Sequence, residues 1–189
     1  HVAGAGVVSR PTSREAIDYL IAGGHRRIAI CINTVEDSDH RDRLAGYRDA
    51  VESHGLGYDD KLVWRVPAYG EGGPQVIKRV LAMSERPTAV YITDPLTCVG
   101  ALAESRRSGL VVPRDLSIVG FDDGDLRKCV TPSLTAVCQD ATALGRAALR
   151  MLDRYMKEES LSMEGLVTPR CWLEIHETTA ALGPAAEPE

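Results

Sequence analysis

Short apolar runs rich in β-branched residues alternate along this chain with segments that have the apolar spacing of helices. The runs lie at residues 28–32, 62–66, 88–93 and 116–121, and a helix-like segment separates each run from the next. A strand that is apolar on both faces is typical of a parallel sheet covered by helices on both sides. Parallel strands are joined by right-handed crossovers. The order therefore predicts an α/β fold with a doubly wound parallel sheet.

Boundary signals predict where the helices begin and end. Thr12 and Glu15 have the spacing of a capping box, and Gly23-Gly24 would end the helix that follows. Asp94 and Pro95 supply an N-cap and an N1 proline for a later helix. The remaining helices of this part are expected over residues 42–54 and 75–83.

The pattern changes after Asp123. A brief strand is expected at residues 134–137, and an extended stretch at 165–176. Between them, a strongly amphipathic helix is expected from Asp140 to about Lys157. Its apolar face contains Leu144, Ala147, Ala148, Met151, Leu152 and Tyr155. This helix needs a second surface to cover, which indicates that the chain leaves the first lobe and returns to another.

Composition and charge exclude several classes of protein. The net charge is −5, with no clustered excess of Lys and Arg, so a nucleic-acid surface is not expected. No apolar run approaches the roughly 18 residues of a membrane span. The five cysteines are scattered and never form a C-x-x-C pair, which predicts reduced thiols without disulfide, metal or cofactor. Residues 1–8 do not have the pattern of a signal peptide, and a cytoplasmic location is expected.

Sequence motifs of common enzymes are missing. The chain has no G-x-S-x-G elbow, no Walker A loop and no G-x-G-x-x-G that opens a helix after a strand. The glycine-rich residues 70–73 are followed by Pro74 and lack the Lys of a phosphate-binding loop. We therefore expect a binding protein and not an enzyme.

Polar side chains follow the predicted strands at one edge of the sheet, where ligands of open parallel sheets bind. In chain order, this edge receives Glu36, Asp37, Ser38, Asp39, Arg43, Ala68, Tyr69, Thr93, Asp94, Asp122, Asp123 and Asp125. Carboxylates accept hydrogen bonds and Arg donates a planar fork, so the set suits a hydroxyl-rich or nitrogen-rich small molecule.

Several of these residues also have a structural interpretation. Asp94 stands where an N-cap belongs, which we favour over ligand contact. Arg43 is either a surface residue paired with Asp39 or a ligand-binding residue, and the sequence leaves both open. Tyr47 is expected in the core. His25 is expected at a helix end, where a cation meets the helix dipole favourably.

Six blocks of the chain resemble the sensor domain of LacI/GalR-type transcription regulators. They are residues 20–30 (LIAGGHRRIAI), 43–50 (RLAGYRDA), 87–102 (PTAVYITDPLTCVGAL), 108–123 (SGLVVPRDLSIVGFDD), 131–137 (TPSLTAV) and Gln139-Asp140. Each block is weak by itself, but the six occur in the order and spacing of the family over about residues 9–178.

The resemblance implies a periplasmic-binding-protein-like sensor, with one nearly complete lobe and part of a second. Such sensors bind a sugar, a nucleobase or a similar metabolite between the lobes and form homodimers. Family members bind operator DNA through an amino-terminal helix-turn-helix headpiece, which this chain does not contain. Mapped onto the family, residues 1–12 are a remnant of the amino-terminal lobe and crossover, 13–134 the carboxyl-terminal lobe, 135–169 the return, 170–180 a final strand on the carboxyl-terminal lobe and 181–189 a flexible tail.

The resemblance also assigns residues to the effector site. Arg43 matches the Arg of R-L-x-G-[YFW] and Asp122 the first Asp of G-[FY]-D-D, two positions that commonly contact effector. Gln139 lies where some members place a polar residue at the lobe interface. The predicted effector-binding residues are Arg43, Asp122, Thr93, Tyr69, Asp39 and Gln139.

Three departures leave the effector open, one of which is Ala141 in place of the aromatic that often follows Gln-Asp. Thr93 replaces an Asn that is common in sugar-binding members, and Tyr69 is about one position out of register as the expected aromatic. The alternative function is a solute-binding protein of a transport system with the same fold.

Overall fold

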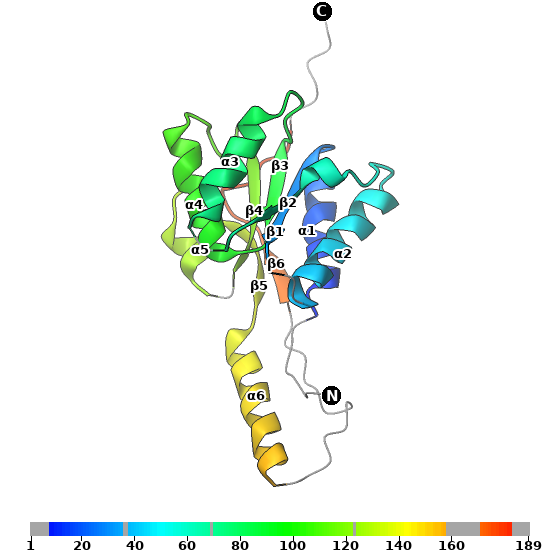
Figure 1. The fold of residues 1–189 in the computed structure, drawn as a ribbon, viewed down its shortest axis with the longest axis vertical. Coiled ribbons are helices and arrows are strands. Elements are labelled where there is room, and N and C mark those ends of the chain that lie inside the picture. Colours follow the sequence, from blue (N-terminus) through cyan, green and yellow to red (C-terminus); the bar gives the residue numbers. More distant parts are fainter. Residues whose placement is uncertain (1–7, 36–37, 69, 123, 158–170, 183–189) are drawn as a thin grey trace, which may run out of the picture.

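A mostly parallel sheet forms the centre of the computed structural model, which describes residues 8–35, 38–68, 70–122, 124–157 and 171–182, with the backbone alone at Asp122. In these residues the sheet has six strands in the order β2-β1-β3-β4-β5-β6 (Figure 1). They are β1 (Ile28–Asn33), β2 (Val63–Val66), β3 (Ala89–Ile92), β4 (Ser117–Asp122), β5 (Thr135–Gln139) and β6 (Cys171–Glu174). Only β6 pairs antiparallel. The predicted α/β fold with a doubly wound sheet is confirmed.

Helices cover both faces of this sheet. The helices α1 (Arg10–Ala22) and α2 (Ser38–Ser53) pack on one face, and α3 (Gly72–Ala82) and α4 (Pro95–Arg107) pack on the other (Figure 1). In β1, the side chains of Ile28, Ile30 and Ile32 face α1 and α2, whereas Ala29 and Cys31 face α3 and α4. Burial on both faces explains why the strands read as unbroken apolar runs.

The predicted capping box of α1 is wrong. The helix begins at Arg10, and the side chain of the N-cap residue Ser9 makes no cap hydrogen bond. Thr12 lies inside the first turn and is buried, so it does not cap the helix. Pro11 accounts for the earlier start, because its fixed φ angle suits the first turn and it has no N–H to leave unpaired.

Asp94 caps α4, as the sequence predicts. Its Oδ1 accepts a hydrogen bond of 2.7 Å from the backbone N–H of Thr97. Replacing Asp94 by Ala is expected to lower the free energy of unfolding by about 1 kcal/mol, because a helix N–H loses its acceptor. Urea unfolding of the full-length protein measures this loss. Asp94→Asn retains an acceptor and serves as the control, so equal losses in both variants would contradict a capping role.

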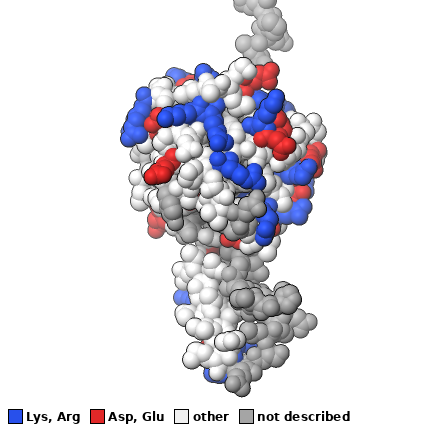
Figure 2. All heavy atoms as spheres, in the orientation of Figure 1, with Lys and Arg blue, Asp and Glu red and all other residues white. Residues whose placement is uncertain are grey.

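Helix α6 (Ala141–Met156) leaves the sheet after β5 and projects away from it (Figure 1). The strand Thr135–Gln139 still pairs with β4, so the chain leaves the sheet after Gln139 and not after Leu134. Four large apolar side chains of α6 are more than half exposed: Leu149, Leu152, Tyr155 and Met156. The visible face of α6 is mostly uncharged (Figure 2). These exposed side chains agree with a helix that needs a second surface, and the division into lobes stays a prediction.

The closing segment, residues 175–182, forms hydrogen bonds with parts of the chain that are distant in sequence. Thr178 bonds to Ile118 twice, because its Oγ1 donates to the Ile118 carbonyl at 2.7 Å and its own carbonyl accepts from the Ile118 N–H at 2.8 Å. The N–H of Leu182 donates to the carbonyl of Gly23 at 2.8 Å. The segment therefore ties β4 to the loop after α1.

His25 connects this closing segment to Thr88, the residue before β3. Its Nε2 lies 3.0 Å from the Ala180 carbonyl oxygen, and its Nδ1 lies 2.9 Å from Oγ1 of Thr88. The side chain is buried, and this burial lowers the pKa of His25. These contacts agree with a structural role for His25, and the lowered pKa favours the neutral ring over the cation expected at a helix end.

The lowered pKa of His25 gives a pH dependence of known sign. Above about pH 6.5 the ring is neutral in both the folded and the unfolded chain, so it makes no difference to stability. Below that pH the unfolded chain binds the proton more readily, and the free energy of unfolding is expected to fall. Urea unfolding at pH 7.5 and 5.5 tests this, with His25→Gln as the control. If the stability of the wild-type protein and that of His25→Gln depended on pH in the same way, His25 would not be the titrating group.

Candidate ligand-binding site

The strand order of the sheet reverses between β1 and β3. From β1 the chain moves to β2 on one side, and it then returns to β3 on the other side. At such a point the connections leave the carboxyl edge in opposite directions and open a crevice in which ligands bind. The helices that follow β1 and β3 are α2 and α4, so residues from the first turns of these helices border this crevice.

Arg43 of α2 is buried at this crevice, with only 9% of its surface exposed. Its Nη1 donates to the carbonyl oxygen of Thr93 at 2.8 Å. Its Cζ lies 3.6 Å from the ring centroid of Phe121, a distance that gives a favourable cation–π contact. Its Nη2 lies 3.9 Å from Oδ2 of Asp39, which is the limit of an ion pair. Of the two interpretations left open by the sequence, a surface residue is excluded and a loose pairing with Asp39 is present.

The Nε of Arg43 is buried and has no hydrogen-bond partner among the residues that the structure describes. Leaving a buried N–H of a charged group unpaired is costly, and such groups usually find a partner. Nε and Nη2 together form the edge of a guanidinium that binds two acceptors in parallel. Such an edge would pair with one or two acceptor atoms of a ligand, but Nε is enclosed in this structure, so the side chains around it would have to move to admit them.

Thr93 turns its hydroxyl into the fold. Its Oγ1 donates to the carbonyl of Cys31 at 3.1 Å and lies 3.3 Å from Nδ1 of His40. Together with its carbonyl, which holds Arg43, these contacts make Thr93 a residue that positions Arg43. Sequence reasoning missed His40, which is buried at the crevice. The available signal was its place three residues before Arg43, on the same face of a helix.

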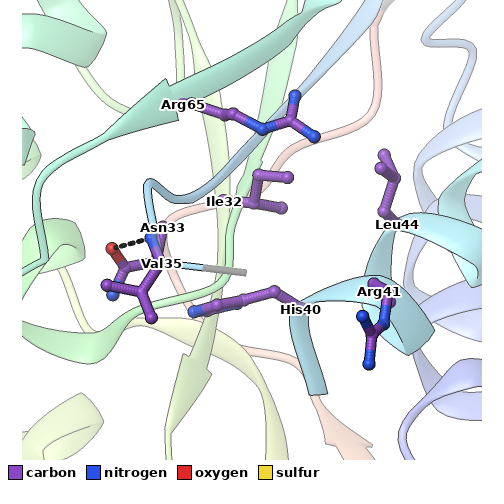
Figure 3. A pocket seen from close by; sticks show the side chains of 7 residues that line it. All are labelled: Ile32, Asn33, Val35, His40, Arg41, Leu44 and Arg65. Atoms are coloured by element: carbon purple, nitrogen blue, oxygen red, sulfur yellow. Dashed lines mark hydrogen bonds between the residues drawn. The ribbon is translucent and has the colours of Figure 1, made fainter. Parts of the chain in front are cut away.

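A small pocket of about 30 Å³ lies beside this crevice, with room for one or two water molecules (Figure 3). Figure 3 shows side chains from β1, β2 and α2 gathered around it. Its lining residues are Ile32, Asn33, Val35, His40, Arg41, Leu44 and Arg65. Asn33 and Arg65 were also missed, although Asn33 is the last residue of β1 and so lies at the carboxyl edge.

The other predicted site residues lie at different distances from Arg43, and some of them fall outside the described residues. Asp39 lies in the first turn of α2, and its side chain is half exposed near Arg43. Gln139 ends β5 opposite Cys171, at the same edge of the sheet but two strands away from β3. Tyr69 and the side chain of Asp122 lie outside the described residues, although the backbone of Asp122 ends β4 at this edge. The structure thus brings together Arg43, Thr93 and Asp39.

Comparison with protein families and known proteins agrees with this geometry. Residues 17–178 match the family described as periplasmic binding protein-like domain. The chain is 33% identical over 168 residues to the HTH-type transcriptional repressor CytR of Escherichia coli K12, covering 89% of this chain and 49% of that protein. It is 32% identical over 148 residues to catabolite control protein A of Priestia megaterium, covering 78% of this chain and 45% of that protein. The chain spans about half the length of these curated relatives.

Solved structures give the same result. A putative transcriptional regulator LacI from Bacillus cereus subsp. cytotoxis superposes with a TM-score of 0.87 at 28% identity, covering 94% of this chain and 62% of that one. In the described part of this chain, no helix is long and apolar enough to cross a membrane. The chain therefore belongs to the family of periplasmic binding protein-like domains, and its relatives are regulators of the LacI type.

Proposed function

We propose that this chain is the effector-binding part of a LacI-type transcription regulator, which senses a sugar, polyol or nucleobase-like metabolite between two lobes. The observation that carries the proposal is Arg43, a buried guanidinium with an unpaired Nε at the carboxyl edge of the sheet. A metabolite with hydroxyl or ring acceptors supplies the missing partner. One structural neighbour, the transcriptional regulator CelR in complex with cellobiose, has a TM-score of 0.82 and 29% identity.

Five further residues belong to the proposed contact set. Asp122 ends β4 at the same edge of the sheet and would accept from hydroxyl or N–H groups of the effector. Gln139 and Tyr69 are proposed as outer contacts, and Thr93 and Asp39 as residues beside Arg43. In this function the protein binds and releases its effector unchanged, so no catalytic step is proposed.

A thermal-shift screen of the full-length protein tests the proposal. Cellobiose, ribose, xylitol and adenine represent the three chemical classes. A ligand at 100 times its Kd is expected to stabilise the protein by about 2.7 kcal/mol, which raises the unfolding temperature measurably. A shift that survives in Arg43→Ala would place binding elsewhere. Failure of sugars, polyols and nucleobases alike to shift the wild-type protein would overturn the effector class.

The partners proposed for the whole protein are operator DNA, bound through a headpiece outside this chain, and a second copy of the protein. This chain alone, with a net charge of −5, is expected to bind no operator. Salt-sensitive binding of a specific duplex by this chain would contradict the proposal. Sedimentation of the full-length protein tests the homodimer.

The alternative is a solute-binding protein of a transport system, which shares this fold. The repressors among the relatives favour the regulator, and with it a cytoplasmic location. The coding sequence upstream of residue 1 discriminates between the two functions. A helix-turn-helix pattern there would support the regulator, and a secretory leader would support the transport protein.

A further inference from the structure

A cluster of polar side chains joins the short helix α5 (Leu126–Cys129) to strand β6. Arg127 of α5 is buried, with 8% of its surface exposed. Its Nε donates to Oε2 of Glu174 at 2.8 Å, and its Nη1 donates to the carbonyl oxygen of Gly124. One guanidinium therefore holds both the segment that follows β4 and the strand β6.

Glu174 is fixed by donors on both of its oxygens. Trp172 donates from Nε1 to Oε1 at 2.9 Å, while Oε2 receives Arg127 and lies 3.4 Å from Nε2 of His176. The Arg127 hydrogen bond, followed by that of Trp172, lowers the pKa of Glu174 to about 2. The carboxylate therefore stays ionised throughout the physiological range.

The segment after β4 lies beside a proposed effector contact, whereas β6 lies beside the point at which the chain leaves the sheet. Gly124 lies two residues after Asp122, the proposed effector contact at the end of β4. Strand β6 pairs with β5, and β5 leads directly into α6, which projects away from the sheet (Figure 1). Arg127 therefore links the ligand-binding edge to the pair of strands through which the chain leaves the sheet and returns to it.

We propose that Arg127 and Glu174 are positioning residues that make the segment after β4 and strand β6 move as one unit. A ligand held at the end of β4 would then displace β6, and the displacement would pass toward the rest of the regulator. This consequence rests on the proposed function, whereas the link itself does not. The two charge-assisted bonds suit the role, because they are short and directional compared with neutral contacts.

An ion pair that only stabilises α5 is the competing explanation. Both explanations predict a loss of stability when the pair is broken, because a buried charge is left without its partner. They differ in whether a change at Gly124 reaches Trp172. A purely stabilising pair does not require such a response, whereas a positioning pair does.

Trp172 provides the measurement, since it and Trp64 are the two tryptophans of this chain. The full-length protein is labelled with 5-fluorotryptophan, and the ¹⁹F resonance of Trp172 is assigned with Trp172→Phe. The perturbation is Gly124→Ala, which narrows the backbone conformations of the residue whose carbonyl Arg127 holds. The Cβ itself fits, because it meets no atom within 4 Å. We expect Gly124→Ala to shift the Trp172 resonance in the wild-type background. The same substitution in an Arg127→Gln or a Glu174→Gln background is expected to leave that resonance unshifted relative to its own parent.

Two controls accompany the measurement. Gly145→Ala in α6 also adds a Cβ in open space, and it is expected to leave Trp172 unshifted. The resonance of Trp64, which is buried in β2 at the other end of the sheet, reports whether each background is folded. If Arg127→Gln does not fold, Arg127→Lys is used in its place, because lysine keeps the charge but lacks the planar fork of the guanidinium.

The proposal is overturned if Gly124→Ala leaves Trp172 unshifted in the wild-type background, or shifts it equally when the ion pair is broken. No effector is used, so failure of the proposed function gives a different pattern. A protein with the expected Trp172 response but no thermal shift with any metabolite would retain the link and lose the effector-binding function.

Discussion

Replacing Gly46 by alanine is expected to lower the free energy of unfolding by about 1–3 kcal/mol. A Cβ at this position would lie 2.3 Å from the carbonyl oxygen of Arg10 and 2.9 Å from Cβ of Ser13. Both atoms belong to α1, which crosses α2 at this point. Backbone atoms cannot rotate away as the end of a long side chain can. The two helices would have to separate and loosen the core beneath them.

Urea unfolding of the full-length protein measures this effect, and Gly145→Ala is the matched control. Gly145 is also a helical glycine, but a Cβ there meets no atom within 4 Å. Alanine at that position is expected to stabilise its helix by up to about 1 kcal/mol. If the two substitutions changed the stability by the same amount and in the same direction, the close crossing of α1 and α2 would be contradicted.

Arg43→Ala is expected to weaken effector binding by roughly 2–5 kcal/mol, which corresponds to about 30- to 5,000-fold in Kd. The acceptor group of the effector would remain desolvated without its donor. Arg43→Lys is expected to recover little of this loss, because a lysine keeps the charge but lacks the Nε and Nη2 edge. Calorimetry on the full-length protein, with the compound selected by the thermal-shift screen, measures both variants.

Two further variants serve as comparisons for this measurement, Asp122→Ala at a proposed contact and Asp94→Ala at a helix cap. We expect Asp122→Ala to lose effector affinity as Arg43→Ala does, since both residues are proposed contacts. The Asp94 variant should keep its effector affinity and lose only stability, because Asp94 caps α4. Wild-type affinity in Arg43→Ala would refute the proposed site, and basal binding of operator DNA by that variant shows whether it is folded.

The sheet could be predicted from the sequence because its strands are buried on both faces. Runs such as residues 28–32 contain no polar residue, and this pattern is incompatible with a solvent-facing strand. Helix starts were less predictable. The first turns of α2 and α3 begin at Ser38 and Gly72, ahead of the apolar spacing that identified both helices. Polar and glycine residues in a first turn carry no such spacing.

The candidate site was predictable in its position but not in its contacts. Arg43 and Thr93 follow neighbouring parallel strands, so the topology alone brings them together. The sequence could not show that the Thr93 hydroxyl turns inward or that Phe121 lies under the guanidinium. Both depend on how side chains pack across the sheet, and the spacing of residues within one element contains no information about that packing.

The order of synthesis has a consequence for the closing segment. Residues 178–182 leave the ribosome after the loop that follows α1 and after the strands β4 and β5, to which they later bond. His25 is made 155 residues before its partner Ala180. At 5–20 residues per second, His25 therefore spends roughly 8–30 seconds without Ala180, and Ile118 spends roughly 3–12 seconds without Thr178. Until Thr178 has been made, the backbone groups of Ile118 and Thr135 that it later bonds stay open to water and to chaperones. Contacts of such long sequence separation also form slowly, so the sheet completes its folding only after residues 178–182 have been made.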